Sequence, residues 1–181
     1  QLIQIKDHGS GISHDDLPEL FGRHATSKIS TADDLYSLQS LGFRGEALYS
    51  VGAIADVMVK SKTNDQDSGW EIHIRGGEQK ACKPSTFGTS GTEISVRELF
   101  FNTPARKKFL KTNTTEMHQI LNTVTPYALL HPSIRFHLSH QSRDLLNCAP
   151  VKSFKDRAAG CLNLDTDYLL EGQEKIPQLN I

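Results

Sequence analysis

The sequence predicts an α+β fold, a two-layer sandwich of helices on a sheet, and three observations support this prediction. Strand-like runs occur at residues 2–6, 56–63, 70–75 and 92–96, whereas helical apolar periodicity occurs at residues 45–54 and 115–130. The strand candidates follow one another as hairpin-like pairs and do not alternate strictly with helices. The chain has no Gly-x-x-x-x-Gly-Lys-Ser/Thr loop, the commonest phosphate-binding loop of parallel folds.

The first strand, residues 2–6, ends in the turn-prone string DHGSG at residues 7–11. A helix is expected next, with Ser13 as its cap and Asp16 three residues later, and Pro18 is tolerated because it falls near the first turn. Residues 45–54 form the next expected helix, since Ala47 and Val51 lie on one apolar side. Turn signals at residues 64–65, 76–77 and 88–91 separate the three strands that follow.

The second half of the chain is expected to hold the longest helix, residues 115–130, which Pro126 should kink or end. Residues 134–139 alternate as a strand does, and residues 143–148 do so less clearly. A last helix is expected at residues 155–162 and a terminal strand at residues 176–181. Because the sequence begins and ends inside strand-like runs, we expect it to be a portion of a longer protein.

Composition limits the class of protein. The chain has 181 residues, a formal net charge of −1, 37% hydrophobic and 23% charged residues, which suits an ordinary globular fold. Nucleic-acid binding would therefore need a local basic patch. No apolar run is long enough to cross a membrane and no signal segment begins the sequence. The three cysteines are far apart and are expected to be buried free thiols in a reducing compartment.

The string DHGSGI at residues 7–12 is the first candidate for chemistry. A carboxylate at the end of a strand is suited to accept a hydrogen bond from an exocyclic amine, and glycines let the backbone approach a flat base. Alone, Asp-x-Gly-x-Gly is also typical of a plain turn or of part of a calcium loop.

Two further strings suit phosphate. In RHATSK, residues 23–28, hydroxyls stand beside cations, although a solvated helix end has the same composition. In LGFRGEAL, residues 41–48, two glycines precede a helix start, which leaves backbone N–H groups for an anion. A simple glycine-rich helix entry is the alternative there. The polar stretch between the two strings has the composition of a mobile lid.

A fourth string runs from GTEISV, residues 91–96, through NTPARKKFL, residues 102–110. Thr92 would begin a strand and place its hydroxyl beside Asp7, or it would be an ordinary β-branched strand residue. The string ends in a basic cluster that either contacts DNA phosphates or forms a solvated helix face. Its members are Arg106, Lys107, Lys108 and Lys111.

Together the four strings resemble the GHKL ATPase superfamily and, within it, the MutL family of DNA mismatch repair proteins. DxGxG, RHATSK, GFRGEAL and NTPARxKFL occur in the order and at the spacing of that family, over roughly residues 2–161. The last three strings are more specific than the first. Gyrase-type topoisomerases, heat-shock chaperones and histidine kinases share the fold but not these longer strings.

The resemblance implies ATP as the ligand. It implies that Asp7 reads adenine and that Gly9, Gly11 and Thr92 line the base pocket. The segments around the phosphates and in the lid would then contribute Thr26, Ser27, Lys28, Gly42, Phe43, Arg44, Gly45, Glu46, Ala47 and Leu48. We expect backbone roles for Gly45, Ala47 and Leu48. Glu46 is expected to cap its helix and is not assigned as a catalytic base.

The sequence departs from the family pattern in two respects. His8 stands where the family has asparagine. The family's glutamate that activates water and its asparagine that binds magnesium are expected before Gln1, and its phosphate-sensing lysine beyond Ile181. No catalytic or metal-binding residue is therefore assigned here, and this chain alone is expected not to hydrolyse ATP. Residues 1–165 would form the ATP-binding domain and residues 166–181 the start of a second, transducer-like domain.

The resemblance also implies partners. ATP binding would drive homo- or heterodimerisation, which clamps double- or single-stranded DNA with little sequence specificity and signals between a MutS-type mismatch-recognition protein and later repair steps. The protein would be cytoplasmic in a bacterium or nuclear in a eukaryote, and not secreted. The alternative is a nucleotide-independent DNA-binding or scaffold module on the same fold.

Overall fold

The computed structural model describes residues 1–23, 42, 45–170 and 172. The chain divides into two compact units, Gln1–Phe109 and Leu110–Ile181, each described here by itself. The predicted strand at residues 176–181 lies outside the described residues. The domain limits 1–165 and 166–181 stay a prediction. Within the described part of the chain, no helix is both long and apolar enough to span a membrane.

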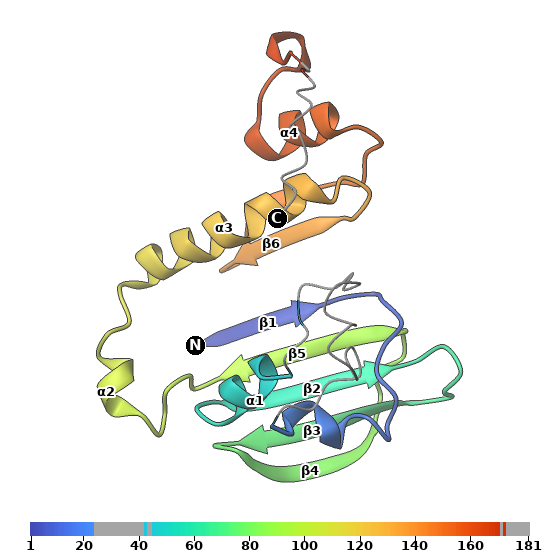
Figure 1. Cartoon of the computed structure of the whole chain (residues 1–181), viewed down its shortest axis with the longest axis vertical. Coiled ribbons are helices and arrows are strands. Elements are labelled where there is room, and N and C mark those ends of the chain that lie inside the picture. The colour runs from blue at the N-terminus through green and yellow to red at the C-terminus, as the bar shows by residue number, and fades with distance from the viewer. Residues whose placement is uncertain (24–41, 43–44, 171, 173–181) are drawn as a thin grey trace, which may run out of the picture. The chain divides into compact units, whose positions relative to one another are not determined.

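A five-stranded antiparallel sheet forms the frame of the first unit, with strand order β1-β5-β2-β3-β4 (Figure 1). Its strands are β1 (Leu2–Lys6), β2 (Asp56–Lys62), β3 (Gly69–Arg75), β4 (Glu78–Ser85) and β5 (Gly91–Arg97). β5 pairs with both β1 and β2, although it follows both strands by many residues in the sequence. The sheet confirms the predicted α+β class.

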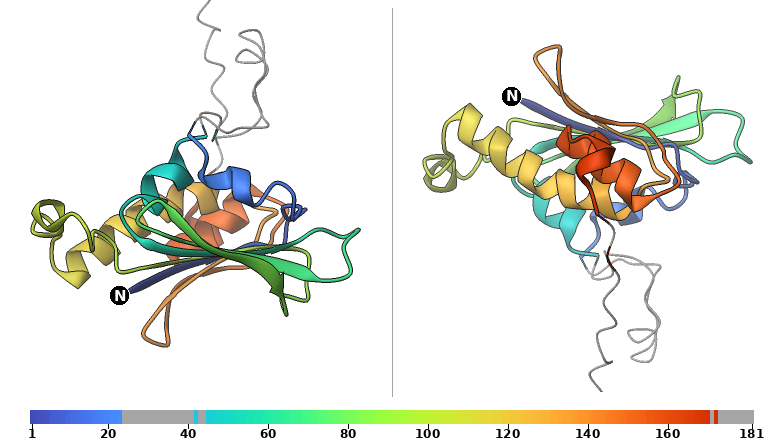
Figure 2. Two further views of the ribbon diagram at one scale, coloured as in Figure 1. Left: turned by 90° about the horizontal axis from the view of Figure 1, so that it is seen from below. Right: turned by 90° about the horizontal axis from the view of Figure 1, so that it is seen from above.

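One face of this sheet carries the short helices and the core. The 3-10 helix η1 (Pro18–Phe21) and the helix α1 (Ala47–Gly52) lie on the same side of the strands, where Figure 2 shows them in blue and teal. Alternate residues of β2 are buried, as expected for a strand with one covered face. The buried cluster consists of Leu17, Ala55, Val57, Val59, Ile72 and Ile74.

Two sequence predictions fail in this unit. β4 was not predicted, because its lysines, glutamine and proline are typical of an exposed segment. Among the described strands it pairs with β3 alone, and at such an edge position Pro84 is tolerated. The helix expected after Ser13 is a turn followed by η1. Ser13 does accept from the Asp16 amide at 3.2 Å, but Pro18 has no N–H to continue an α-helix.

The end of α1 is held by two distant segments. The carbonyls of four consecutive residues accept hydrogen bonds from outside the helix, at 2.8–3.1 Å. Gly77 N and Gly76 N, at the tip of the β3–β4 hairpin, donate to Gly52 and Ala55. Phe100 N donates to Ile54, and the Asn102 side chain donates to Ala53. Phe100 and Asn102 thus have a structural task, just before the short helix α2 (Pro104–Lys107).

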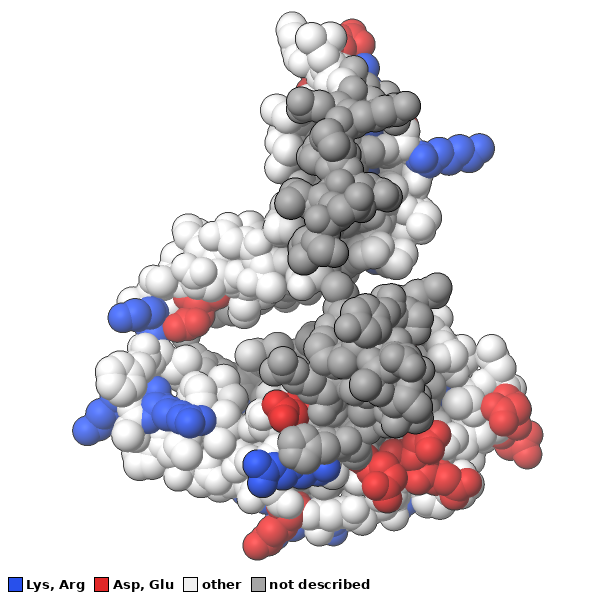
Figure 3. Space-filling view, in the orientation of Figure 1, with Lys and Arg blue, Asp and Glu red and all other residues white. Residues whose placement is uncertain are grey.

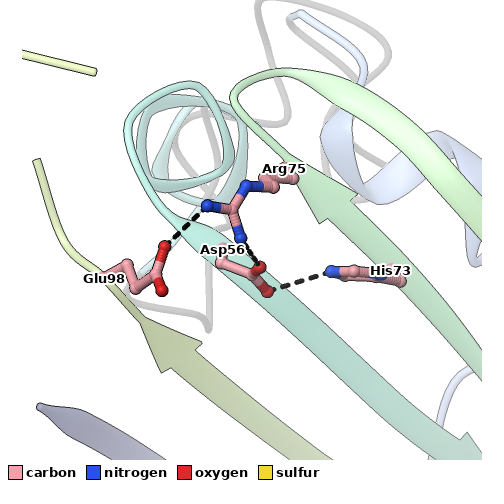
Figure 4. A network of polar contacts seen from close by, with 4 residues as sticks. All are labelled: Asp56, His73, Arg75 and Glu98. Atoms are coloured by element: carbon pink, nitrogen blue, oxygen red, sulfur yellow. Dashed lines mark hydrogen bonds and ion pairs between the residues drawn. The ribbon is translucent and has the colours of Figure 1, made fainter. Parts of the chain in front are cut away.

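A polar network joins β2, β3 and the end of β5 near α1 (Figure 4). Asp56 accepts from Arg75 at 2.6 Å and pairs with His73 at 2.9 Å, while Arg75 also donates to Glu98 at 2.7 Å. The hydrogen bond with Asp56, followed by the charge of Glu98, raises the pKa of Arg75 above its usual value. The guanidinium lies 4.7 Å from the centre of the Phe101 ring. This network fixes residues 98–101, between the two parts of the fourth string, against the sheet.

The second unit packs helices on a hairpin. Its helix α3 (Asn113–Leu130) runs through Pro126, so the helix does not end at that residue, and the expected kink there stays a prediction. Residues on both sides of Pro126, including Leu121 and Ala128, pack into one cluster with the hairpin, which holds the helix together. The other elements are β6 (Phe136–His140), β7 (Arg143–Cys148), α4 (Phe154–Leu162) and η3 (Thr166–Tyr168).

The cysteines depart from expectation. Cys148 of β7 and Cys161 of α4 form a disulfide with a Cα–Cα distance of 5.8 Å, so the prediction of three free thiols is wrong for two of them. Their distance along the sequence concealed this pairing, because β7 and α4 meet only in the folded unit. Cys82 is free and half-buried.

A buried arginine organises the turn between α3 and β6. Arg157 of α4 is 1% exposed, and the two protons of its Nη2 are shared among the carbonyls of His131, Pro132 and Ile134. A buried charge is costly unless it is hydrogen-bonded, so these three carbonyls and the guanidinium depend on one another.

Replacing Arg157 by methionine should therefore destabilise the protein by about 2–3 kcal/mol, since the apolar side chain takes the charged donor away from these partly buried hydrogen bonds. Urea unfolding followed by circular dichroism measures the change. The control is Lys155→Met on the same helix, expected to change stability by less than about 0.5 kcal/mol. Equal unfolding midpoints for the two variants would contradict this role for Arg157.

Candidate functional site

Three polar side chains lie side by side across neighbouring strands at one end of the sheet. Ser61 of β2 is directly opposite Thr92 of β5. Asp7 follows β1, its N–H donates to the Thr92 carbonyl at 2.9 Å, and it continues the register in which Lys6 faces Glu93. Because paired residues of antiparallel strands point to the same face, all three belong to the face that carries the core. We name Asp7, Thr92 and Ser61 the polar row.

The Asp7 carboxylate is oriented by backbone N–H groups. Its Oδ1 accepts from Gly9 N at 2.9 Å and from Thr92 N at 3.2 Å. Among the described residues, no hydrogen bond reaches Oδ2. Because Asp7 is exposed, this second oxygen remains an acceptor for a ligand. Of the sequence-predicted residues, Asp7, Gly9 and Thr92 are therefore brought together.

Two glycines are required by close backbone contacts in this region. Gly11 has φ +77°, and a side chain there would overlap the Lys62 carbonyl at the end of β2. Gly91 has φ +123°, and a side chain there would overlap the Asp7 carbonyl. Gly11 was predicted to let the backbone approach a base. The structure shows in addition that it lets the loop after Asp7 pass close to the end of β2. Gly91 was quoted in the fourth string without a role; its contact sets the distance between β5 and Asp7.

Ser61 was missed by sequence reasoning. It is 0% exposed, and its hydroxyl contacts the Ile12 amide at 2.8 Å, the Gly91 carbonyl at 2.8 Å and the Thr92 hydroxyl at 2.9 Å. The signal in the sequence was a serine at the third inward position of β2, after Val57 and Val59. A buried polar residue in an otherwise apolar strand face calls for an explanation by partners.

The third string is described only in part. Gly42, Gly45, Glu46, Ala47 and Leu48 are described, and Gly45 has φ +63°, which suits a glycine before a helix. α1 begins at Ala47, two residues later than predicted, and has six residues. Glu46 is the N-cap but makes no side-chain cap bond, so its expected capping role is wrong: cap side chains are usually shorter than glutamate.

Five predicted phosphate and lid residues lie outside the described residues. They are Thr26, Ser27, Lys28, Phe43 and Arg44. The expectation that Asp7 and the amides around Gly45 meet opposite ends of one ligand therefore stays a prediction. The structure does place η1, which follows Asp7 along the chain, and α1, which follows Gly45, in contact on one face of the sheet.

The basic cluster is exposed at all four positions. Within the described residues, none of its side chains forms an ion pair. Arg106, Lys107 and Lys108 lie at the end of the first unit, whereas Lys111 belongs to the second. Figure 3 shows lysine and arginine side chains in blue at the edge of the molecule where Figure 1 places α2. These side chains are available to an anionic partner.

The chemistry of the polar row is that of an acceptor site. A carboxylate oxygen and a hydroxyl at the end of a sheet suit a ligand edge that carries N–H donors, with glycine backbone beside it. No group of three or more His, Cys, Asp or Glu side chains in the described residues has the arrangement of a metal site. We assign no nucleophile or general base to the polar row.

Curated relatives match most of the chain. A DNA mismatch repair protein MutL of Exiguobacterium is 47% identical over 146 residues, 81% of this chain and 24% of the relative. The MutL of Koribacter versatilis is 42% identical over 180 residues, 99% of this chain and 26% of the relative. The chain thus spans about a quarter of the length of these relatives. No protein-family model matches it.

Solved structures give the same result for the fold. The Aquifex aeolicus MutL ATPase domain complexed with ADP superposes with a TM-score of 0.69 at 29% identity, over 90% of this chain and 57% of that one. The N-terminal domain of a DNA repair protein superposes with a TM-score of 0.70 at 26% identity, over 88% of this chain and 47% of that one. With the polar row, the glycine contacts and these likenesses together, the chain belongs to the MutL family and has the fold of its ATPase domain.

Proposed function

We propose that this chain is the ATP-binding portion of a DNA mismatch repair protein, an ATP-driven dimerising clamp that couples mismatch recognition to later repair. The observation that carries the proposal is the oriented carboxylate of Asp7 beside Thr92, with Gly9 and Gly11 next to it. It is supported by the ATPase-domain neighbours, one of which was solved with ADP.

In this proposal the adenine amine donates to Asp7 Oδ2, the oxygen that no described residue occupies. Oδ1 is already committed to two backbone N–H groups, so the carboxylate cannot rotate freely and meets the base in one orientation. A side chain at Gly9 would lie 3.1 Å from Asp7 Oδ1, a tight contact, so glycine leaves the orientation of this carboxylate undisturbed. The phosphates would lie towards Gly45 and the start of α1, together with Thr26, Ser27, Lys28 and Arg44.

Magnesium is assigned no residue of this chain. We propose that its ligand and the water-activating glutamate come from elsewhere in the full-length protein, as the family resemblance implies. The remaining partners of the proposal are DNA, a MutS-type protein and a second ATPase domain. The alternative, a nucleotide-independent scaffold, is not favoured, since the polar row is intact.

Asp7→Asn should reduce ATP affinity of the full-length protein by roughly 10- to 150-fold, because a carboxylate–amine hydrogen bond contributes about 1.5–3 kcal/mol. Isothermal titration calorimetry with ATP measures this loss. Asp15→Asn is the matched control, since Asp15 is an exposed aspartate in the same segment. Identical titrations of wild type and Asp7→Asn would refute the nucleotide site.

The isolated chain, residues 1–181, should show no ATP turnover above background, because no general base for water is assigned within it. Phosphate release by the isolated chain and by the full-length protein, measured at equal concentration, tests this. Turnover by the isolated chain that a substitution within it abolishes would contradict the proposal.

The basic cluster should contribute to DNA affinity through phosphate contacts. Lys107→Glu with Lys108→Glu should weaken binding of the full-length protein to duplexes of unrelated sequence alike. It should also lower the slope of log affinity against log salt by up to about 2, since each contact contributes about 0.9. Fluorescence anisotropy measures both quantities. Lys80→Glu with Lys83→Glu, on β4, is the charge-matched control, and an equal effect of both pairs would rule out a local contact.

A further inference from the structure

We propose that Ser61 is a positioning residue that fixes the hydroxyl proton of Thr92 and thereby sets a preference for 6-amino over 6-oxo purines. This inference rests on the proposed nucleotide site and extends it to a residue that does not touch the ligand. It follows from counting protons among the buried oxygen and nitrogen atoms around Ser61.

A serine hydroxyl has one proton and two lone pairs. The Ile12 amide can only donate, so its contact at 2.8 Å occupies one lone pair of Ser61. The Gly91 carbonyl can only accept, and two oxygens 2.8 Å apart repel unless a proton lies between them. The Ser61 proton is therefore directed to Gly91.

The remaining contact is then determined. The hydroxyls of Ser61 and Thr92 lie 2.9 Å apart, and the Ser61 proton is already committed to Gly91. The bond must be made by the Thr92 proton, which points to the second lone pair of Ser61. The Thr92 oxygen consequently keeps only lone pairs for its other surroundings.

In this arrangement both groups of the polar row that lie beside the proposed ligand, the Asp7 carboxylate and the Thr92 hydroxyl oxygen, are hydrogen-bond acceptors. Thr92 donates its backbone N–H to Asp7 Oδ1 and continues the register of β1 and β5 opposite Asp7, so the two side chains are neighbours on one face of the sheet. Asp7 Oδ2 and the Thr92 oxygen both present lone pairs, which suits an amino group or a water that donates to both. A 6-oxo group would place an acceptor against these acceptors. A buried, fully paired hydroxyl such as Ser61 holds this polarity because its reorientation breaks several bonds at once.

A merely structural Ser61 would have a different signature. Its bond to the Ile12 amide anchors the loop that follows Asp7, so removal of Ser61 affects the loop as well. Loss of that anchor would weaken every nucleotide by the same factor. Loss of the proton direction would change the ratio of affinities, because a freed Thr92 hydroxyl turns and donates to a 6-oxo group.

The experiment compares binding of ATP and inosine triphosphate to the full-length protein by calorimetry. Wild type should prefer ATP, and Ser61→Ala should lower the ATP-to-inosine triphosphate affinity ratio on the order of tenfold, the value of one hydrogen bond. Ser61→Thr, which keeps the hydroxyl, should restore the wild-type ratio. Thr92→Val should lower the ratio too, and Ser61→Ala added to Thr92→Val should lower it no further.

Each outcome decides the matter. An equal loss of both affinities in Ser61→Ala, or an unchanged ratio, overturns the positioning role and leaves the nucleotide site in place. If Ser61→Ala does not fold, Thr92→Val and Ser61→Thr still test the inference: an unchanged ratio in Thr92→Val, or a lowered ratio in Ser61→Thr although the hydroxyl is kept, overturns it. Equal affinity of wild type for the two nucleotides also overturns the inference. Failure of Asp7→Asn to weaken ATP binding is a separate result, which refutes the proposed function itself.

Discussion

The pairing of β5 with both β1 and β2 is the constraint on which the rest of the site depends. It brings together residues about 30 and 85 positions apart, because Thr92 lies opposite Ser61 on one side and bonds to Asp7 on the other. Gly91 permits the approach, since any side chain there would overlap the Asp7 backbone. A one-residue shift of β5 would turn Thr92 to the opposite face and separate the polar row.

Much of the fold could be predicted from the sequence because its strands alternate cleanly. β1, β2, β3, β5 and the helix α3 were predicted close to their bounds. The covered face of β2 leaves a clear alternation of apolar residues, whereas β1 is exposed along its length and was predicted from its apolar residues alone. β4 was missed because an edge strand can be polar on both faces, and the α-helix expected around Pro18 was wrong because a local cap does not supply the missing N–H. These errors fall where tertiary context, and not local pattern, decides the structure.

The residues of the candidate site could be predicted from the sequence less completely than the strands. The resemblance to a known family identified Asp7, Gly9 and Thr92, which the structure brings together, but it did not point to Ser61. Serine in a strand carries no motif, and its importance depends on three partners from two separate segments, the loop after Asp7 and the start of β5. The Cys148–Cys161 pair was hidden for the same reason, because spacing along the chain does not show which elements meet. By contrast, Asn102, which belongs to the fourth string interpreted as a binding motif, also supports the end of α1.

The two ends of α1 differ in how they are held, because four consecutive carbonyls at its C-terminal end accept hydrogen bonds from other segments. From Gly52 to Ala55 each carbonyl accepts a bond from the β3–β4 hairpin tip or from the segment that follows β5. Helix ends ordinarily fray independently of their surroundings. Here the last turn can unwind only if the hairpin tip and the segment after β5 release it together, so this end of α1 shares the cooperative stability of the sheet. Any adjustment of the helix to a bound molecule is consequently confined to its first turn, next to Gly45.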